Sequence, residues 1–481
     1  MIRFHRRLAL ASATLLASVA SWAAPASAQQ APWAAPDVPV SGHDRVYAAE
    51  QFSNTVSVVD PSTNRLLGVI KLGDPQPMNM SPLYKGQVLV HGMGFSPDGQ
   101  TLAIVSIGSN AVSFIDTATN TVKHTTYVGR SPHEAFFTPD GSEVWVTVRG
   151  EDYVSVLDAR TFAEKDRVKT PGGPGMTIFS PDGRLAYVCS SFNPELAIFE
   201  TKSRKRVGTV AQPSPFCPNI AATPDGKQVW FTLKDVGRTV VIDARPPFAV
   251  LKVMDTGPIT NHVNFAKTKA GLRAYVTIGG ENKVRVFTTD SFEEKAVIPV
   301  GALPHGVWPS GDGSRIYVGL ENADQLAAID TATNKVIANI PIGQAPQAIA
   351  YIPNAARGGA DTATLQPLGT AGETTSLTLK AVADGKPATS VTLFDQGLTQ
   401  IVQAAATGLQ PKHAYVLALS DKADGSGPHQ ALARFMTNPA GGAIVNATGP
   451  IRQILQAPAT APVRYLVILE EDGRIVQVQA R

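Results

Sequence analysis

The sequence predicts an all-β protein: a seven-bladed β-propeller followed by a smaller, β-sandwich-like domain. A turn tripeptide, Pro-Asp-Gly, recurs around Asp98, Asp140, Asp182 and Asp225 at spacings of 42, 42 and 43 residues, and a variant, Gly311–Gly313, follows two repeat lengths later. Stretches of alternating apolar and polar residues flank the turns, which is the pattern of half-buried strands. Four such strands in a repeat of about 40 to 45 residues are typical of a propeller blade.

The number of blades follows from counting equivalent strands. The strand before each turn is expected to be the innermost of its blade; these strands lie near residues 90, 134, 175, 219, 262, 305 and 347. The strand after each turn is expected beside it; these strands begin near Arg45, Thr101, Glu143, Leu185, Gln228, Leu272 and Arg315. The repeat region opens on a second strand and ends on an innermost one. One blade must therefore join both ends of the region, which closes the ring.

The first residues have the pattern of an export signal. Arg3, Arg6 and Arg7 form a basic start, residues 8–19 an apolar core, and Ala-Ser-Ala at 26–28 a cleavage site. We therefore expect a signal peptide over residues 1–28 and a periplasmic or secreted product. The Arg6-Arg7 pair leaves both the general secretory and the twin-arginine routes open.

The charge balance bears on the partners. The signal contains three of the 42 Lys and Arg residues and none of the 39 Asp and Glu residues, so 39 of each kind remain after it. A chain with no net charge and no basic run is not expected to bind nucleic acid. No later apolar run reaches the roughly 18 residues of a membrane helix, so no integral membrane segment is expected.

The repeat pattern stops after the propeller, which is predicted over residues 44–353. A linker rich in Ala and Gly is expected over 354–362, and a small β-rich domain over 363–481. Strand-like alternation in that domain occurs at 375–383, 388–394, 413–419 and 464–469, and one helix is expected around Ile451–Gln456.

The chain has two cysteines, Cys189 and Cys217. In an oxidising compartment an isolated pair more often forms a disulfide than a redox or metal site. Cys189 is expected late in a second strand and Cys217 just before the innermost strand of the next blade. We therefore predict a disulfide between adjacent blades, with two buried thiols as the alternative.

The repeats resemble those of the YVTN β-propeller family. The resemblance is in the sequences Ala-Tyr-Val-Thr at 274–277, Val-Trp-Val-Thr at 144–147, Arg-Ile-Tyr-Val at 315–318 and Asp-Thr-Ala-Thr-Asn at 116–120 and 330–334. It covers residues 44–353 and implies the fold. Such propellers include surface proteins, periplasmic binding proteins and relatives of the haem-binding, cytochrome d1-like and copper-binding propellers, so the resemblance does not decide the function.

Four histidines occupy one repeat position. His91, His133 and His305 each stand seven residues before the turn aspartate, and His262 has the corresponding place in the degenerate repeat. Equivalent positions in a closed ring converge on the channel mouth. Converging imidazoles suit copper, zinc or iron, so these four are the predicted metal ligands, with copper as the leading candidate. The alternative is that each ring only bonds loop carbonyls.

Other polar residues are expected around the same mouth. The predicted ligand-binding residues are Glu134, Arg149, Asn219, Lys234, Asn261 and Glu321, and Glu50 and Glu281 also end second strands. Glu134 could act as a base or orient a histidine.

Three functions remain open. The first is an exported protein that binds a small molecule, a metal or a protein partner at the propeller face. The second is a copper- or haem-dependent periplasmic oxidoreductase that uses the same histidines. The third is a lactone hydrolase, because seven-bladed lactonases also have a histidine-containing segment before a Pro-Asp-Gly turn, as in Arg-Ser-Pro-His at 130–133.

Overall fold

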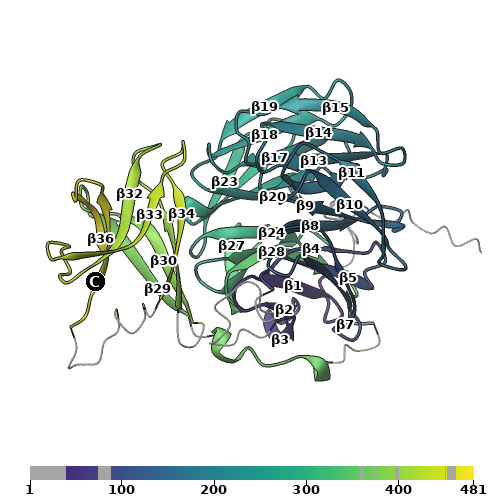
Figure 1. Ribbon diagram of the computed structural model, residues 1–481. Helices are drawn as coiled ribbons and strands as arrows, with labels where there is room; N and C mark the ends of the chain where they lie inside the picture. Colours follow the sequence, from purple (N-terminus) through teal and green to yellow (C-terminus); the bar gives the residue numbers. More distant parts are fainter. Residues whose placement is uncertain are drawn as a thin grey trace, which may run out of the picture.

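The computed structural model describes residues 39–73, 88–357, 362–372, 374–395, 400–449, 451, 455 and 462–480. They form a β-propeller and a separate β-sheet domain that stands against one face of it (Figure 1). The signal peptide expected over residues 1–28 lies outside the described residues.

The propeller has seven four-stranded blades, as predicted. From the channel outward, the blades are β28-β1-β2-β3 (Pro346–Ile352, Arg45–Glu50, Thr55–Asp60, Arg65–Lys71), β4-β5-β6-β7 (Val90–Phe95, Thr101–Ser106, Ala111–Asp116, Thr121–Tyr127), β8-β9-β10-β11 (Pro132–Phe137, Glu143–Val148, Tyr153–Asp158, Glu164–Lys169), β12-β13-β14-β15 (Pro174–Phe179, Leu185–Ser190, Glu195–Glu200, Arg206–Ala211), β16-β17-β18-β19 (Ile220–Ala222, Gln228–Leu233, Arg238–Asp243, Val250–Asp255), β20-β21-β22-β23 (Thr260–Thr268, Gly271–Ile278, Lys283–Thr288, Glu294–Pro299) and β24-β25-β26-β27 (Pro304–Pro309, Arg315–Leu320, Gln325–Asp330, Lys335–Pro341).

The ring closes as the strand count predicts. β28, the last strand of the propeller, pairs antiparallel with β1, the first, for example through Tyr47 and Ala350. Burial falls from the channel outward: β4 and β8 are buried throughout, whereas β7 and β11 are mostly exposed. The core of the propeller therefore lies between neighbouring blades, where apolar faces of successive sheets pack.

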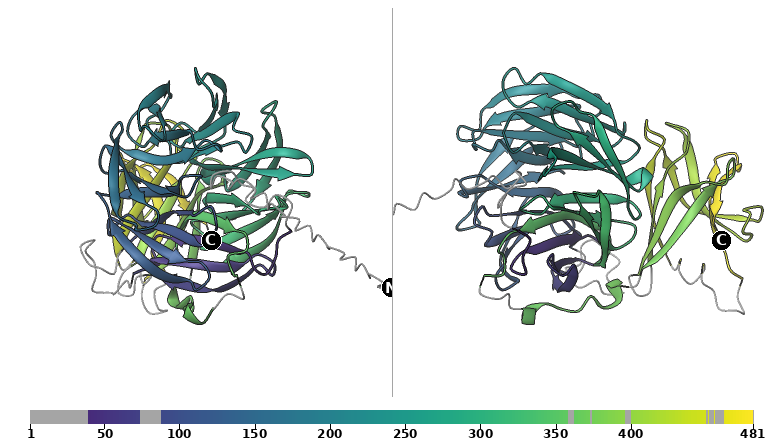
Figure 2. Two further views of the ribbon diagram at one scale, coloured as in Figure 1. Left: turned by 90° about the vertical axis from the view of Figure 1, so that its right-hand side faces the viewer. Right: turned by 180° about the vertical axis from the view of Figure 1, so that it is seen from behind.

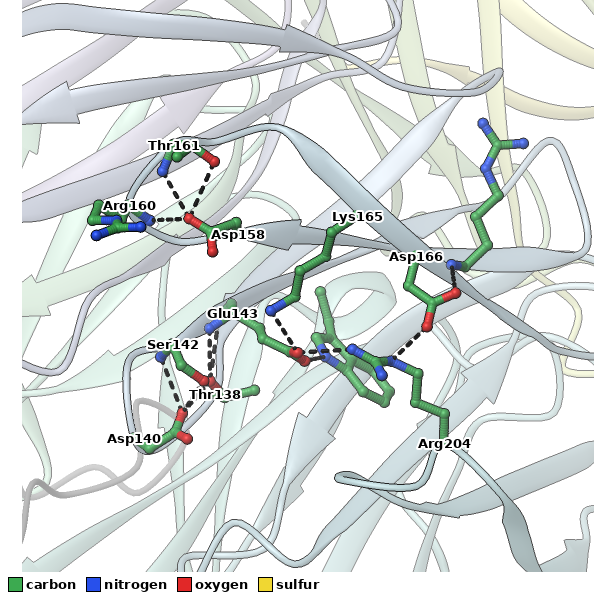
Figure 3. Close-up of polar contacts among 12 residues, drawn as sticks. Thr138, Asp140, Ser142, Glu143, Asp158, Arg160, Thr161, Lys165, Asp166 and Arg204 are labelled. Atoms are coloured by element: carbon green, nitrogen blue, oxygen red, sulfur yellow. Dashed lines mark hydrogen bonds and ion pairs between the residues drawn. The ribbon is translucent and has the colours of Figure 1, made fainter.

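The Pro-Asp-Gly turns lie on the face of the disc away from the histidines and are held by their own side chains. The Thr138 hydroxyl donates to Asp140, 2.6 Å away. Beside this turn, Glu143 receives hydrogen bonds from Trp145 Nε1 and from Arg204 of the next blade, each at 2.8 Å, and Arg204 also lies 3.2 Å from Asp166 (Figure 3). These contacts tie adjacent blades together at their outer edge.

A disulfide joins the blades of β13 and β16. Cys189 lies in β13 and Cys217 just before β16, with their Cα atoms 5.9 Å apart. The sequence prediction of an inter-blade disulfide is confirmed. The bridge fixes the segment before β16 against the neighbouring blade, close to the face on which the histidines lie.

The C-terminal domain is one antiparallel sheet of eight strands. Their order is β33-β32-β35-β36-β29-β30-β31-β34 (His429–Met436, Ala414–Ser420, Tyr465–Glu470, Ile475–Gln479, Thr375–Ala381, Pro387–Asp395, Gln400–Ala406, Ala443–Gly449). The edge strands β33 and β34 contact each other, so the sheet is nearly closed around a core that includes Leu379, Val402 and Leu417. Of the helix expected around Ile451–Gln456, the structure describes only Ile451 and Leu455, both buried against this core.

Short 3₁₀ turns occur at Gly279–Glu281, Thr362–Thr364 and Gly369–Gly372. Between the propeller and the sheet domain, Gln366 pairs with Val69 of β3, and Thr364 donates to the carbonyl of Thr119. The chain that follows the propeller thus runs along its rim before the first strand of the sheet domain begins at Thr375. Among the described residues, no helix has the length and hydropathy of a membrane span.

Candidate functional site

The structure brings the four predicted histidines together at the mouth of the channel. The ring centroids of His91 and His133 are 4.4 Å apart, and those of His262 and His305 are 4.8 Å apart. The two pairs meet where His91 and His305 approach edge-on, with centroids 6.5 Å apart. All four side chains are buried. The geometric condition for a shared ligand, that the rings converge, is therefore met.

A β-bulge presents each histidine to the channel. Pairing between innermost and second strands breaks between Val90 and Met93, Pro132 and Ala135, Thr260 and Val263, and Pro304 and Val307. In each break, two residues of the innermost strand, one of them the histidine, oppose a single residue of its partner. His91, His133 and His305 are the first of the two residues, but His262 is the second, and Asn261 takes the equivalent place. The expectation that His262 shares the repeat position of the other three is therefore wrong by one residue. Bulges re-aim side chains and are common beside active sites.

The loops that lead into these bulges have an unusual backbone. Leu89, Ser131, Ile259 and Leu303 all have positive φ, between 48° and 55°, just before the histidine positions. This conformation is costly for branched, bulky residues and persists only where the surroundings impose it. Side chains of the preceding blade hold it: Asn110 Oδ1 accepts from Ser131 N at 2.9 Å, and Asn282 Oδ1 accepts from Leu303 N at 2.9 Å.

Threonines of the second strands fix the bulges to one another. The hydroxyl of Thr277 accepts from His262 N at 2.9 Å and donates to the carbonyl of His305 in the next blade at 2.7 Å. Thr147 likewise accepts from Glu134 N at 3.0 Å and donates to the carbonyl of Gly175 at 2.9 Å. These are the threonines of the two Val-Thr repeat motifs, so residues of the repeat sequence connect each bulge to the innermost strand of the next blade.

The hydrogen bonds define the tautomer of His133. Its Nδ1 lies 2.8 Å from the carbonyl oxygen of Gly175, which can only accept, so Nδ1 carries the proton and Nε2 keeps a lone pair. Within the described residues, Nδ1 of His91 and Nδ1 of His305 are buried without a hydrogen bond, although His305 Nδ1 lies 3.3 Å from Glu321 Oε2. The cluster thus offers unsatisfied nitrogen atoms in a buried place.

Burial keeps the histidines neutral. It lowers the pKa of His91 and His262 to about 3 and that of His133 and His305 well below the usual value. The positive charges of Arg149 and Lys234 act in the same direction. Burial also raises the pKa of Glu134 to about 8. Neutral imidazole is the form that binds metal ions, so protons do not compete for the ring nitrogens near neutral pH.

The residues present fit a transition-metal ion. Donor atoms of His91, His133 and Glu134 all lie within 4.8 Å of one another. Two imidazoles and a carboxylate suit copper, zinc or iron. Gly92 makes this approach possible, because a Cβ at that position would lie 2.1 Å from the His133 carbonyl oxygen and 2.5 Å from Glu134 Oε2. Below the rings, a cavity of about 30 Å³ reaches Met93, Glu134 and His262, which is room for roughly one water molecule.

The predicted ligand-binding residues have different surroundings. Arg149 and Lys234 are half-buried at the mouth, and neither has an ion-pair partner within 4.0 Å among the described residues. Glu321 accepts a 2.6 Å hydrogen bond from Gln403 of the sheet domain, and burial raises its pKa. Asn261 is buried, and its Oδ1 makes no hydrogen bond within the described residues.

Three other residues expected at the mouth already have polar partners. Two of them make hydrogen bonds within the propeller, and the third is exposed. Asn219 uses its Oδ1 to accept from Val263 N at 2.8 Å, so it joins two innermost strands. Glu50 is fully buried, and Thr55 and Ser57 of the same blade donate to it. Glu281 is exposed and pairs with Lys283 at 3.3 Å.

The sheet domain covers part of the mouth, which sequence reasoning missed. Phe394 packs against Phe52 with tilted rings whose centroids are 4.8 Å apart, and Thr374 donates to Asp324 at 2.8 Å. Ile259 and Leu303 pack against Ala405 and Ile444. No local sequence signal marks contacts between segments so distant along the chain.

Comparisons with known proteins agree with the fold. The model of the family described as lactonase, 7-bladed beta-propeller, matches residues 109–230, which is less than half of the chain. No curated protein matches.

One solved structure supports this fold, and two others are similar to the chain more weakly. A protein of unknown function from Desulfotomaculum acetoxidans DSM 771 is 14% identical with a TM-score of 0.53, over 64% of this chain and 98% of that one. Kuenenia stuttgartiensis hydrazine synthase is 19% identical with a TM-score of 0.48, over 67% and 96%. A dihydro-haem d1 dehydrogenase, NirN, in complex with DHE is 13% identical with a TM-score of 0.48, over 86% and 79%. At 14% identity, the likeness to the Desulfotomaculum protein shows the fold alone.

Proposed function

We propose that this chain is an exported YVTN-type propeller that binds a transition-metal ion, with copper preferred, at the channel mouth. The observation that carries the proposal is the convergence of two histidine pairs in which His133 keeps a lone pair on Nε2 while Nδ1 of His91 and Nδ1 of His305 make no hydrogen bond among the described residues. Export is supported by the signal pattern over residues 1–28 and by the disulfide.

Each residue of the proposed metal site has a distinct role. His91, His133 and Glu134 would hold the ion, and the carbonyl of Gly175 orients the His133 ring. His262 and His305 complete the wall of the site. A bound copper ion would supply one-electron chemistry or a Lewis acid for an exogenous ligand. The same site therefore serves either a binding protein or a copper-dependent oxidoreductase.

Metal titration tests the proposal. Metal-depleted protein is titrated calorimetrically with Cu(II) and, separately, with Zn(II). We expect one ion per chain in the wild type and loss of that binding in His133→Ala and His91→Ala. His429→Ala, which changes an exposed histidine of the sheet domain, is the matched control and should bind like the wild type. Equal binding in all four proteins would refute the proposal.

Lactone hydrolysis is the second candidate. It is favoured by the family match over residues 109–230, which includes His133, Glu134 and Arg149. In this reading Glu134 or His133 would activate water and Arg149 would stabilise the developing oxyanion. Proton release from δ-gluconolactone by metal-depleted protein tests it. Turnover that is lost in Glu134→Gln supports this candidate, and no turnover above the uncatalysed rate eliminates it for that lactone.

A further inference from the structure

The sheet domain covers the channel mouth on one side only. Its contacts with the propeller involve the loops around Phe52, Asp235, Ile259, Asn322 and Asp324. Between the described residues, no hydrogen bond, ion pair or ring contact connects it to the blades β8-β9-β10-β11 and β12-β13-β14-β15. Both views in Figure 2 place the domain against a single face of the disc. The open side of the mouth is therefore the side of these two blades.

An arginine with an aromatic lining stands on that open side. Arg149 follows β9, and its guanidinium carbon lies 5.7 Å from the ring centroid of Phe192 and 5.5 Å from that of Phe216. The two rings hold the guanidinium without neutralising it, since no described carboxylate pairs with it. Cation–π contacts of this kind fix an arginine in place and leave its N–H donors free.

Local structure keeps both rings where they are. Phe192 lies on Gly173, where a Cβ would come within 2.2 Å of its Cδ2 atom and where φ is +76°. Phe216 directly precedes Cys217, which the disulfide fixes to β13. The aromatic lining of Arg149 thus depends on one glycine and one disulfide.

A second cation faces the same cluster. Lys234 follows β17, and its charge acts on His91, His262 and His305, while the charge of Arg149 acts on His91 and His133. Neither cation makes an ion pair within the part of the chain that the structure describes. Glu321 and Asp235 act on the charge of Lys234, whereas no described carboxylate acts on the guanidinium of Arg149. A partly buried cation without a counter-charge is costly unless an anion completes the site. A metal cation beside Arg149 would increase that demand.

We infer that the mouth binds a small anion with delocalised charge, which is held by Arg149 and Lys234 next to the histidines. A guanidinium between apolar rings favours weakly hydrated, planar or linear anions over strongly hydrated ones. The narrow cavity beneath the rings stops the anion at the level of the histidines. This inference rests on the proposed function and names the class of ligand. The anion is held by protein side chains and not by a metal, so it can be tested in metal-depleted protein.

Binding of azide and nitrite to metal-depleted, full-length protein tests the inference. Calorimetric titration should give saturable binding of at least one of the two, with sulfate weaker. Arg149→Gln and Lys234→Gln should each raise the Kd about 10-fold or more, and the double variant should not bind. Arg149→Lys keeps the charge and should lie in between. Arg184→Gln and Lys227→Gln, exposed residues beside the Pro-Asp-Gly turns, are the matched controls and should bind like the wild type.

The outcomes separate the two proposals. Anion binding that depends on Arg149 and Lys234 in a protein that takes up no metal sustains the inference while the metal proposal fails. Stoichiometric metal with no anion binding, or with the same Kd in wild type and double variant, overturns the inference and leaves the metal proposal standing. Circular dichroism of each variant identifies any that does not fold; Arg149→Lys then decides the role of the arginine.

Discussion

Nδ1 of His133 donates a hydrogen bond to the carbonyl oxygen of Gly175, 2.8 Å away in the next blade. The histidine of one repeat is therefore oriented by the corresponding residue of the following repeat, which has no side chain of its own. The same carbonyl also accepts from Thr147, so the ring and the bulge beside it share one anchor. The lone pair on Nε2 is therefore left available to a ligand.

The first prediction concerns Gly92, because any side chain at this position would collide with its neighbours. In Gly92→Ala the new Cβ would meet the His133 carbonyl oxygen and the Glu134 carboxylate at less than 3 Å, so both must move. We expect the variant to fold, to lose about 1 to 3 kcal/mol of stability and to bind copper at least ten times more weakly. Chemical denaturation and copper titration measure these effects. Gly42→Ala, with only an ordinary contact to Ser62 Oγ at 3.6 Å, is the control.

The buried carboxyl of Glu50 predicts a pH dependence of stability. Burial raises its pKa from 4.5 to about 7. The folded protein therefore holds this proton more tightly than the unfolded chain. The stability that it contributes is full below pH 4.5 and is lost as the pH rises to 7, by about 3 kcal/mol.

Glu50→Gln removes that titration. The variant should match the wild type in stability near pH 5 and exceed it near pH 8, as measured by urea unfolding. A difference that does not change with pH would contradict the assignment. Asp324, whose pKa burial also raises to about 7, adds a dependence of the same sign in both proteins.

The disulfide is expected to act on both stability and the anion site. It closes a loop with a sequence separation of 28 residues, so the double variant Cys189→Ala/Cys217→Ala should lose about 3 to 4 kcal/mol. Because Phe216 adjoins Cys217, azide should also bind the variant more weakly. Reductant should lower the Tm of the wild type and leave that of the variant unchanged; equal Tm values for oxidised and reduced wild type would contradict this.

The contact between Phe394 and Phe52 should hold the sheet domain against the covered side of the mouth. Phe394 is fully buried, and Phe394→Ala should weaken the docking of the sheet domain by about 3 kcal/mol. Hydrogen exchange should then increase in the loops around Phe52 and Ala345 and stay constant around Arg149. Faster exchange around Arg149 as well would mean that the sheet domain also covers that side.

The sequence predicted the blades and the closure of the ring because the same turn and strand pattern recurs in each repeat. The positions of the two cysteines within that pattern predicted the disulfide. The pattern also placed His91, His133 and His305 at one repeat position, but it missed that Asn261, and not His262, is their equivalent. The bulges at Val90–Met93 and the three equivalent breaks could not be predicted, because they depend on pairing register between strands. The positive φ values of Leu89 and Leu303 run against residue preference and are imposed by neighbouring blades.

Other features of the site depend on contacts between distant segments. Gln403 reaches Glu321 across 82 residues, and no pattern in either segment predicts it. Glu50 lies at the end of a second strand, as Arg149 does, yet Thr55 and Ser57 hold it inside the blade. Position in the repeat therefore predicted which face a residue belongs to, but not whether its side chain opens to the channel.

Electron paramagnetic resonance of the protein loaded with one equivalent of Cu(II) tests the central claim most directly. We predict a single copper species with hyperfine coupling to at least two imidazole nitrogens, and loss of that species in the His91→Ala/His133→Ala variant. A spectrum of aquated copper in the wild type, or an imidazole-coupled spectrum that is unchanged in the double variant, would contradict the claim that these histidines form a metal site.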